Sequence, residues 1–364
     1  MLVVALLVAA AAPPFVVGDL KVFRDWAIGC DNGRDCHATS LPIEEGPEEP
    51  LGDGDLIITI KRSGHPYSPV SVSIGGEGAL RFREIRAASS KRRAIRRISV
   101  DNRKLAIRLK PAPNGDELDA ASSAKLIAAM RGKNTFSLLD HGGQPMAVAS
   151  IRGLDQVLAY LDERQYLTGT VAALARPSKK PVNARNVPPM VPRHRILVAG
   201  KPDTPPSMTD DLQLARLREG DPCLEYSKDV IPGTPSYYRL DPAKTLMILP
   251  TVCGGYNPYR MLFIVDEKGT AQPARFWPYP GNAMEVAPDL PDVGWNEKTR
   301  MLESFGRGRV LADCGQTQAY VWYEGRFKLV HDARMAPCRG RTDYITTYYI
   351  EVVTVGRSKP GIKH

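Results

Sequence analysis

The sequence predicts an α+β protein that is rich in β-structure: two antiparallel-sheet domains with a few short helices, stapled by disulfides. Three observations support this class. Gly and Pro contribute 31 residues each to a chain of 364, which is typical of loop-rich, strand-rich domains and not of helix bundles. The apolar fraction of 43% and the charged fraction of 24% are those of a globular chain. Six cysteines, an even number, are consistent with a disulfide framework.

Residues 1–18 form a signal-like segment. Residues 2–12 are an unbroken apolar run, which is long enough for the core of a signal peptide and too short to span a bilayer. Small residues follow, and cleavage after Ala11 or after Gly18 fits the usual site, although no Lys or Arg precedes the run. A buried first strand is the alternative, but a run that ends in two prolines makes a poor strand. We therefore expect export to the periplasm.

The cysteines are sequential neighbours, namely Cys30 with Cys36, Cys223 with Cys253, and Cys314 with Cys338. Six cysteines permit about 15 connectivities, among which pairing between neighbours is the simplest. A metal site built on Cys30, Cys36 and His37 is the alternative, but the chain has no C-x-x-C and no second pair of ligands. We expect three local disulfides, no bound metal and no cofactor.

The first domain is expected over residues 19–168. Its expected strands, which carry alternating apolar positions, are residues 55–62, 80–86, 104–110 and 134–140. A helix over residues 119–131 is expected to begin at Asp119 as its N-cap and to end at Gly132. An amphipathic helix over residues 153–164 closes the domain.

Residues 169–206 are expected to form a linker. Eight prolines among Lys, Asn and Arg are typical of an extended, semi-rigid segment. A short apolar run within it, residues 196–199, is expected to dock onto one of the neighbouring domains.

The second domain, residues 207–364, is expected to be a β-meander. A short helix over residues 209–219 opens it, with Asp210 and Asp211 in the first turn. The expected strands are residues 245–249, 259–265, 309–312, 318–323, 326–330 and 346–355. Between two of these strands, Glu324 and Gly325 form a good two-residue hairpin turn.

Two groups of residues resemble known families of exported proteins. The first group is Phe23, Asp25, Trp26 and Cys30, followed by Cys36. It resembles the opening of the invasion-associated locus B-like proteins, whose first domain also ends in a helix like the one expected over residues 153–164. The second group is Cys253-Gly254-Gly255-Tyr256-Asn257, Asp313-Cys314-Gly315, Trp322, Gly325, Phe327 and Cys338-Arg339-Gly340. It resembles the exported Gram-negative family named domain of unknown function 1176. The resemblance implies a periplasmic location and a β-rich fold, and it supplies no catalytic residues.

Ser122 and Lys125 match S-x-x-K, in which a helix places a serine nucleophile and a lysine base on one face. The companion K-T-G and S-D-N motifs of such enzymes are absent, as are G-x-S-x-G, H-E-x-x-H and the P-loop. The six histidines show no ligand spacing. The sequence therefore favours a protein of uncharacterised function that binds an envelope component or another protein. The alternatives are a periplasmic hydrolase that uses Ser122 and Lys125 on an envelope polymer, and a structural partner of outer-membrane assemblies.

Aromatic residues bracket a Pro- and Gly-rich stretch of the second domain, with Tyr256, Tyr259, Trp277 and Trp295 as the candidate lining of a glycan or peptide groove. Aromatic faces bury apolar surface of a ligand while a polar tip stays in water. The alternative is ordinary core and loop packing, because the domain has few other large side chains.

Basic residues concentrate in residues 81–110, where twelve Lys and Arg face two acidic residues, an excess comparable with the net charge of +9 for the whole chain. Its centre, Arg92, Arg93, Arg96 and Arg97, is a candidate face for anionic ligands. An acidic loop at residues 44–55 is the favoured intramolecular partner. Anionic envelope polymers or lipid head groups are the alternative, which implies peripheral membrane contact. Nucleic acid is not expected, because one aromatic residue, Phe82, lies in the window.

Overall fold

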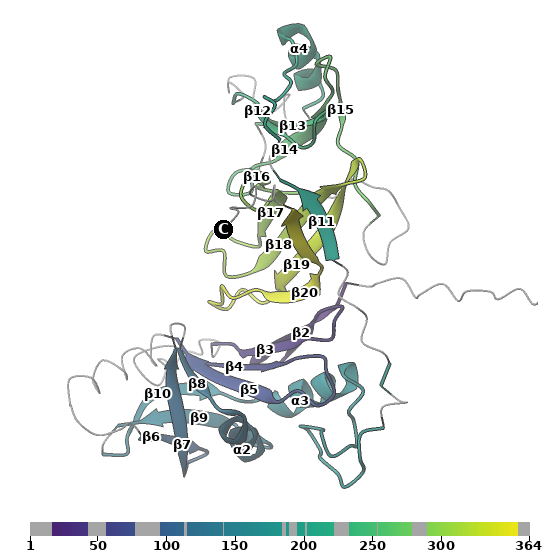
Figure 1. Cartoon of the computed structure of the whole chain (residues 1–364). Coiled ribbons are helices and arrows are strands. Elements are labelled where there is room, and N and C mark those ends of the chain that lie inside the picture. The colour runs from purple at the N-terminus through teal and green to yellow at the C-terminus, as the bar shows by residue number, and fades with distance from the viewer. Residues whose placement is uncertain are drawn as a thin grey trace, which may run out of the picture.

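The computed structural model describes residues 17–42, 56–76, 95–112, 115–140, 142–183, 187–188, 195–200, 202–221, 233–252, 254–278 and 290–355. The described chain forms an N-terminal lobe (residues 19–183) and a C-terminal lobe (residues 195–355), stacked end to end (Figure 1). Antiparallel sheets dominate both lobes, which confirms the β-rich class.

The N-terminal lobe is built on one antiparallel sheet of ten strands. They are β1 Leu20–Phe23, β2 Trp26–Cys30, β3 Cys36–Ser40, β4 Ile57–Arg62, β5 Val70–Gly75, β6 Ile95–Val100, β7 Arg103–Ala112, β8 Gly115–Leu118, β9 Thr135–Leu139 and β10 Pro145–Ser150. Their order in the sheet is β1-β2-β3-β4-β5-β8-β7-β6-β9-β10. Three of the four predicted strands match β4, β7 and β9, and the fourth, residues 80–86, lies outside the described residues.

Two helices pack on this sheet, as predicted. Helix α2, Ala120–Met130, begins at Asp119, whose carboxylate accepts a hydrogen bond from the backbone N–H of Ser122 at 2.8 Å. Gly132, with φ of +66°, follows its end. Helix α3, Leu154–Arg164, turns its leucine face inward because those positions recur at helical spacing. The fully buried residues of the resulting core include Trp26, Ile58, Ile74, Ile98, Leu126, Phe136 and Leu158.

The C-terminal lobe contains a four-stranded and a five-stranded antiparallel sheet. The first comprises β12 Ser236–Arg239, β13 Thr245–Pro250, β14 Arg260–Val265 and β15 Ala271–Pro273, with α4 Asp211–Glu219 packed beside it. The second comprises β16 Gly294–Asn296, β17 Met301–Arg307, β18 Gly315–Tyr323, β19 Arg326–Met335 and β20 Ile345–Tyr349, in that order. Each strand in this order is adjacent to the next one along the chain, which is the predicted meander.

A parallel ribbon joins the connecting segment to the end of the chain. Strand β11, Arg195–Ala199, pairs in parallel with β21, Glu351–Val355. This pairing confirms that the apolar run in the connecting segment docks onto a neighbour. Ile196 and Val198 of β11 are buried in the C-terminal core. The predicted strand 346–355 is therefore two strands, β20 and β21, because the chain changes partner at Ile350.

Two local predictions in this lobe had opposite outcomes. The hairpin turn between β18 and β19 is confirmed, with Glu324 and Gly325 both at positive φ, +48° and +76°. The predicted strand 309–312 is wrong, because these residues form the turn between β17 and β18. Val310 and Leu311 gave that segment its apolar pattern, but they are 72% and 70% exposed at the turn.

Two of the three predicted disulfides are confirmed. Cys30–Cys36 closes the β2–β3 hairpin, and Cys314–Cys338 joins the start of β18 to the loop after β19. The first pair leaves no thiolates for the alternative metal site. Cys223 and Cys253, the third predicted pair, lie outside the described residues.

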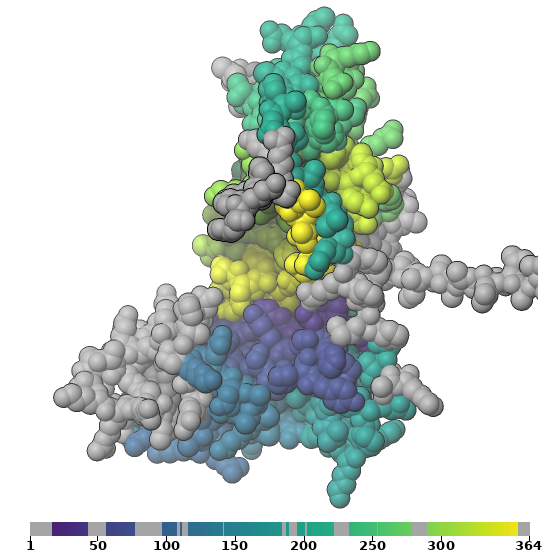
Figure 2. Space-filling model, in the orientation of Figure 1, coloured from purple at the N-terminus to yellow at the C-terminus, as the bar shows by residue number. Residues whose placement is uncertain are grey.

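The two lobes meet where β2 and β3 face β20. Figure 2 shows the first strands of the chain in direct contact with its last part. The approach is close, since a Cβ on Gly29 would lie 2.8 Å from Cγ2 of Ile345. Ala27 and Leu41 of the N-terminal lobe form one buried cluster with Met335 and Ile345 of the C-terminal lobe.

Polar contacts seal the edge of this interface. Nη2 of Arg339 lies 2.9 Å from Oδ1 of the buried Asp25, which also forms an ion pair with Arg152. Burial alone would raise the pKa of Asp25, but hydrogen bonds from Ser150, Arg339 and Arg152 lower it. Asp25 therefore stays charged and links the two lobes.

Candidate functional site

A groove of about 1130 Å³ lies over the five-stranded sheet of the C-terminal lobe. Residues of β16, β17, β18 and β19 line it, together with the segment where β20 passes into β21. Its volume is slightly above the range of about 300–1,000 Å³ that is usual for ligand pockets. The groove is open on one side, which suits a ligand that extends beyond it.

One row of directly opposed residues crosses the whole sheet inside this groove. The row consists of Gly294, Glu303, Ala319, His331 and Tyr349, one from each strand. Opposed residues of antiparallel strands project from the same face, so Glu303 and His331 flank Ala319. Neighbouring strands are about 4.8 Å apart, which places the Cα atoms of Glu303 and His331 about 10 Å apart. Ala319 therefore forms the small floor of a trough, with the carboxylate of Glu303 on one side and the imidazole of His331 on the other.

The turn between β16 and β17 orients Glu303. Its Oε1 accepts hydrogen bonds from Nδ2 of Asn296 at 3.0 Å and from Oγ1 of Thr299 at 3.3 Å. Oδ1 of Asn296 accepts the backbone N–H groups of Lys298 and Thr299, at 3.0 and 3.2 Å. One asparagine therefore fixes both the turn and the carboxylate. Glu303 is exposed, so its carboxylate can accept hydrogen bonds from a ligand.

His331 stands on the other side of the floor. Its Nε2 lies 3.4 Å from Oγ1 of Thr346, and its ring meets the ring of Tyr349 edge-on at 6.4 Å between centroids. Burial lowers the pKa of His331, although the neighbouring Asp332 opposes this shift. The imidazole is therefore neutral at pH 7, with one nitrogen that donates and one that accepts.

Apolar side chains complete the walls of the groove. Met301 and Phe305 lie two residues before and after Glu303 on β17, and therefore on the same face. Ile350, between β20 and β21, and Val352 of β21 line another side of the groove. The groove thus combines apolar walls with a few oriented polar groups, a composition typical of ligand sites.

Asp332 belongs to the framework under the groove. It follows His331 on β19 and points to the opposite face, where it is fully buried. It accepts hydrogen bonds from Nε of Arg334 at 2.8 Å and from Oγ1 of Thr347 at 2.6 Å. Burial alone would raise its pKa, but these bonds lower it and keep it charged. It is satisfied by the protein itself and takes no part in the trough.

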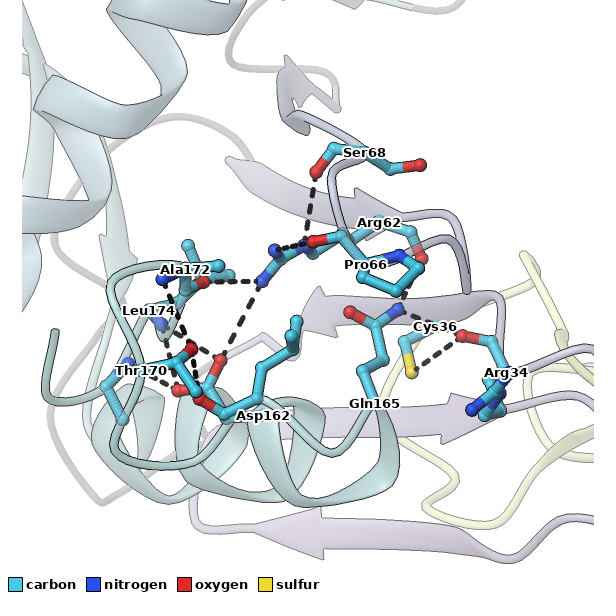
Figure 3. A network of polar contacts seen from close by, with 12 residues as sticks. Arg34, Cys36, Arg62, Pro66, Ser68, Asp162, Gln165, Thr170, Ala172 and Leu174 are labelled. Carbon is cyan, nitrogen blue, oxygen red and sulfur yellow. Dashed lines mark hydrogen bonds and ion pairs between the residues drawn. The ribbon is translucent and has the colours of Figure 1, made fainter. Parts of the chain in front are cut away.

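A second hollow, of about 710 Å³, lies in the N-terminal lobe beside α3. Figure 3 shows the polar network at its wall. Nη1 of Arg62 lies 3.8 Å from Oδ1 of Asp162, and the two side chains are only 4% and 2% exposed. Asp162 also accepts the backbone N–H of Leu174 at 2.8 Å, while Arg62 donates to the carbonyl of Ala172 at 2.9 Å.

This network fixes the segment after α3 to the sheet. Nε2 of Gln165 donates to the carbonyls of Arg34 and Ser63, at 2.9 and 3.0 Å. Burial raises the pKa of Asp162 and lowers the pKa of Arg62, while each group partly offsets the shift of the other. These side chains bond almost entirely to the chain itself, so we assign the network a structural role.

The predicted aromatic residues do not form one cluster. Trp295 borders the groove, and its ring packs under the guanidinium of Arg300 at 5.0 Å. Tyr256 and Tyr259 are 49% and 37% exposed in the loop before β14, beside the end of β17. Trp277 lies at the β18–β19 turn, where its Nε1 donates to the carbonyl of Tyr323 at 3.2 Å.

Two of the four arginines of the predicted basic face lie on a described strand. Arg92 and Arg93, like the acidic loop at residues 44–55, lie outside the described residues. Arg96 and Arg97 are on β6, where they oppose Ile107 and Ala106 of β7, and Arg97 is exposed. The pairing of this basic face with the acidic loop and its binding of anionic envelope polymers or lipid head groups both remain predictions.

The S-x-x-K pair lies far from the groove, in the first turns of α2. Ser122 is half-buried, and its backbone N–H is bonded to the N-cap Asp119. Lys125 is exposed. A lysine that serves as a base in this chemistry is normally desolvated, so its exposure gives the pair no support.

The residues that carried the family resemblance hold the architecture together. Asn257 pairs with Arg307 through two hydrogen bonds of 2.9 Å and so caps the edge of β17 beyond β16. Gly315 has φ of +140°, and a Cβ there would lie 2.0 Å from the carbonyl oxygen of Gly306. Asp25 of the first group forms its ion pair with Arg339 of the second, at the lobe interface.

These features define a two-lobed, β-rich protein with a disulfide-closed hairpin and an open groove over its C-terminal sheet. Among the described residues, no cluster of three His, Cys, Asp or Glu side chains is arranged to hold a metal ion. The chain belongs to the family described as "Protein of unknown function (DUF1176)", whose model matches residues 20–351.

A curated relative covers nearly the whole chain. The chain is 27% identical over 330 residues to the "Uncharacterized protein YpfG" of Escherichia coli strain K12, which covers 87% of this chain and 88% of that protein. No solved structure matches the chain.

Proposed function

We propose that this protein is exported to the periplasm and acts there by binding an envelope component in the C-terminal groove, without catalysis of its own. The observation that carries the proposal is the row from Gly294 to Tyr349, in which oriented polar side chains stand open over a sheet. In the N-terminal lobe, by contrast, the side chains of Arg62 and Asp162 are buried and bonded to the chain itself.

Export is supported by the signal-like run at residues 2–12 and by two disulfides, which persist in oxidising compartments. Within the described part of the chain, no helix has the length and apolar character needed to cross a membrane. Val17 is buried in the C-terminal core, and Gly18 donates its N–H to the carbonyl of Thr347 at 2.8 Å. Cleavage after Ala11 would keep these contacts, whereas cleavage after Gly18 would remove them. The likeness of the N-terminal lobe to invasion-associated locus B-like proteins is part of this proposal.

The surroundings of His331 support binding rather than catalysis. A hydrolytic histidine needs a nucleophile within hydrogen-bond reach and an orienting acid. Oγ1 of Thr346 lies 3.4 Å from Nε2 of His331. The neighbouring carboxylate, Asp332, faces the opposite side of the sheet and is bonded there to Arg334 and Thr347, so it does not orient the imidazole toward that hydroxyl. The hydroxyl of Ser304, which borders the groove, donates to the carbonyl of Pro291 at 2.7 Å.

The test uses the full chain with oxidised disulfides and a groove-filling variant, Gly294→Trp. Gly294 lines the groove, and a Cβ there meets no atom within 4 Å, so the backbone position accepts a side chain that can fill the groove. We expect soluble envelope fragments, including muropeptides, to contain a ligand that binds the parent and fails to bind Gly294→Trp by calorimetry. Binding that survives the filled groove contradicts the proposal.

Turnover tests the hydrolase alternative. We expect no hydrolysis of muropeptides or ester substrates by the purified parent protein. Hydrolysis that Ser122→Ala abolishes would establish the S-x-x-K enzyme instead. Cross-linking in intact cells addresses the third function class, since specific adducts with outer-membrane proteins and no soluble ligand would indicate a structural partner.

A further inference from the structure

We propose that the ligand of the groove is an uncharged sugar chain, one ring of which lies over Ala319 between Glu303 and His331. This inference rests on the proposed function and names the class of ligand. It follows from four properties of the trough: its width, its hydrogen-bonding groups, its apolar walls and its charge.

The width fits a single ring. Glu303 and His331 occupy alternate strands, so their Cα atoms are about 10 Å apart across the small side chain of Ala319. This spacing leaves room for one flat ring on the floor and one hydrogen bond on each side. Gly294, at the end of the row, keeps the trough open toward its rim.

The polar groups suit hydroxyls, each of which donates one hydrogen bond and accepts others. The carboxylate of Glu303 only accepts, and a bond from a hydroxyl to it is charge-assisted and therefore strong. The neutral imidazole of His331 offers one donor or one acceptor, whichever the ligand needs. Thr317, two residues from Ala319 on β18 and therefore on the same face, lines the same groove and adds a hydroxyl that can donate and accept.

The walls suit the C–H faces of sugar rings. Phe305 lies two residues beyond Glu303 on the same face of β17, and Tyr349 closes the far end of the row. Aromatic side chains of this kind bury apolar ligand surface while polar groups beside them fix its orientation. Trp295, at the border of the groove, also provides a fluorescent reporter of binding.

Charge disfavours anionic ligands, although the chain as a whole carries +9. Glu303 contributes a negative charge to the trough, and His331 contributes no positive charge at neutral pH. The groove lining includes one lysine, Lys298, against the carboxylates of Asp292, Glu297 and Glu303, so a phosphate or carboxylate over Ala319 would meet net repulsion.

A peptide that adds a strand to the sheet is also disfavoured at β17. The part of this strand beyond β16 is already capped, since Phe305 donates its N–H to the carbonyl of Pro291 and Asn257 pairs with Arg307. Recognition in the groove must therefore rely on side chains over the face of the sheet and not on main-chain pairing at this edge.

The experiment titrates the oxidised full chain with chitohexaose, cellohexaose, hexalysine and polygalacturonate, followed by calorimetry and tryptophan fluorescence. We expect at least one of the neutral hexasaccharides to bind and both charged polymers to fail to bind at the groove. Glu303→Ala should weaken sugar binding by roughly tenfold or more, the usual effect of losing a hydrogen bond to a charged group. His331→Ala should weaken it by a smaller factor.

Two control variants make the outcome decisive. Glu267→Gln alters an exposed glutamate in the β14–β15 turn and should leave binding unchanged. Gly294→Trp should abolish binding while the melting temperature stays near that of the parent. Hexalysine binding that Gly294→Trp abolishes, with no sugar binding, overturns the sugar assignment and leaves the proposed groove intact. Sugar binding that Gly294→Trp does not affect overturns both the sugar assignment and the proposed groove. Absence of sugar binding at millimolar concentration overturns the sugar assignment.

Discussion

In the N-terminal lobe, Arg62, Asp162 and Gln165 direct their hydrogen bonds to the chain itself, whereas in the C-terminal lobe Glu303 and His331 face an open groove. Both places contain groups whose pKa is shifted by burial, namely Asp162 and His331. A shifted pKa therefore does not distinguish a framework from a ligand site. The distinction lies in whether the polar atoms are closed in by the chain or left for a ligand.

The largest expected effect comes from breaking the closed network. Asp162→Ala should lower the free energy of unfolding by about 3–5 kcal/mol, because it leaves the buried guanidinium of Arg62 without a counter-charge. Denaturant unfolding of the purified variant measures this change. The double variant Arg62→Met with Asp162→Leu is the control and should recover most of the loss. A cost of less than about 1 kcal/mol for the single variant would show that water reaches the pair.

The loss of unfolding free energy on removing each disulfide gives a second comparison of the two lobes. In the loop-entropy model, removal of Cys314–Cys338, with a separation of 24 residues, should cost about 3.5 kcal/mol. Removal of Cys30–Cys36, with a separation of 6 residues, should cost about 2.4 kcal/mol. Paired Cys→Ala variants, unfolded by denaturant, provide the measurement. A larger loss at the short loop would indicate that Cys30–Cys36 contributes through the lobe interface.

Acid should act with opposite sign through Asp313 of the C-terminal lobe and Asp162 of the N-terminal lobe. Hydrogen bonding from Arg309 lowers the pKa of Asp313 to about 2, so its stabilising contribution is present above about pH 4 and is lost as pH falls toward 2. Burial raises the pKa of Asp162, so the folded state takes up its proton more readily than the unfolded state, and this contribution to stability grows as the pH falls toward about 4 and changes no further below it. Asp313→Asn should flatten the decline of stability between pH 4 and pH 2, whereas Asp162→Asn should remove the gain in stability that the parent shows as the pH falls toward about 4. Melting temperatures between about pH 2 and about pH 7 test both, and unchanged profiles in the two variants would contradict the assignment.

The smallest effect on stability is expected in the groove. Glu303→Gln should change the free energy of unfolding by less than about 0.5 kcal/mol, because the side chain is exposed and the amide keeps an oxygen for Asn296. Calorimetric unfolding beside Asp162→Asn gives the comparison directly. A loss of more than about 1 kcal/mol would move Glu303 from the ligand site to the framework.

Local chemistry explains which predictions succeeded. The N-cap Asp119 and the turn at Glu324-Gly325 depend on a few neighbouring residues, and both are present. The ten-stranded sheet depends on pairings such as β5 with β8 and β6 with β9, which join strands distant along the chain. Residues 309–312 were misread because an apolar pair at an exposed turn has the same pattern as a short strand.

The candidate site was harder to predict than the fold. Glu303 lay in no predicted strand, and His331 lay one residue beyond one. The two come together only through the registers of β17 with β18 and of β18 with β19, and the second register shifts at a bulge between Ala319 and Tyr320. A shift of one residue turns each side chain to the other face, so sequence periodicity alone cannot define the row.

The parallel pairing of β11 with β21 constrains the order in which the chain acquires its structure during synthesis. Strand β11 is made more than 150 residues before its partner, and Gly18 before it must wait for Thr347 to satisfy its N–H. Strand β11 and the segment at Gly18 therefore stay unpaired until the last strands have emerged. Until β21 has been synthesised, the unpaired edge of β11 is exposed to other chains, so the newly made protein needs protection from aggregation during this interval.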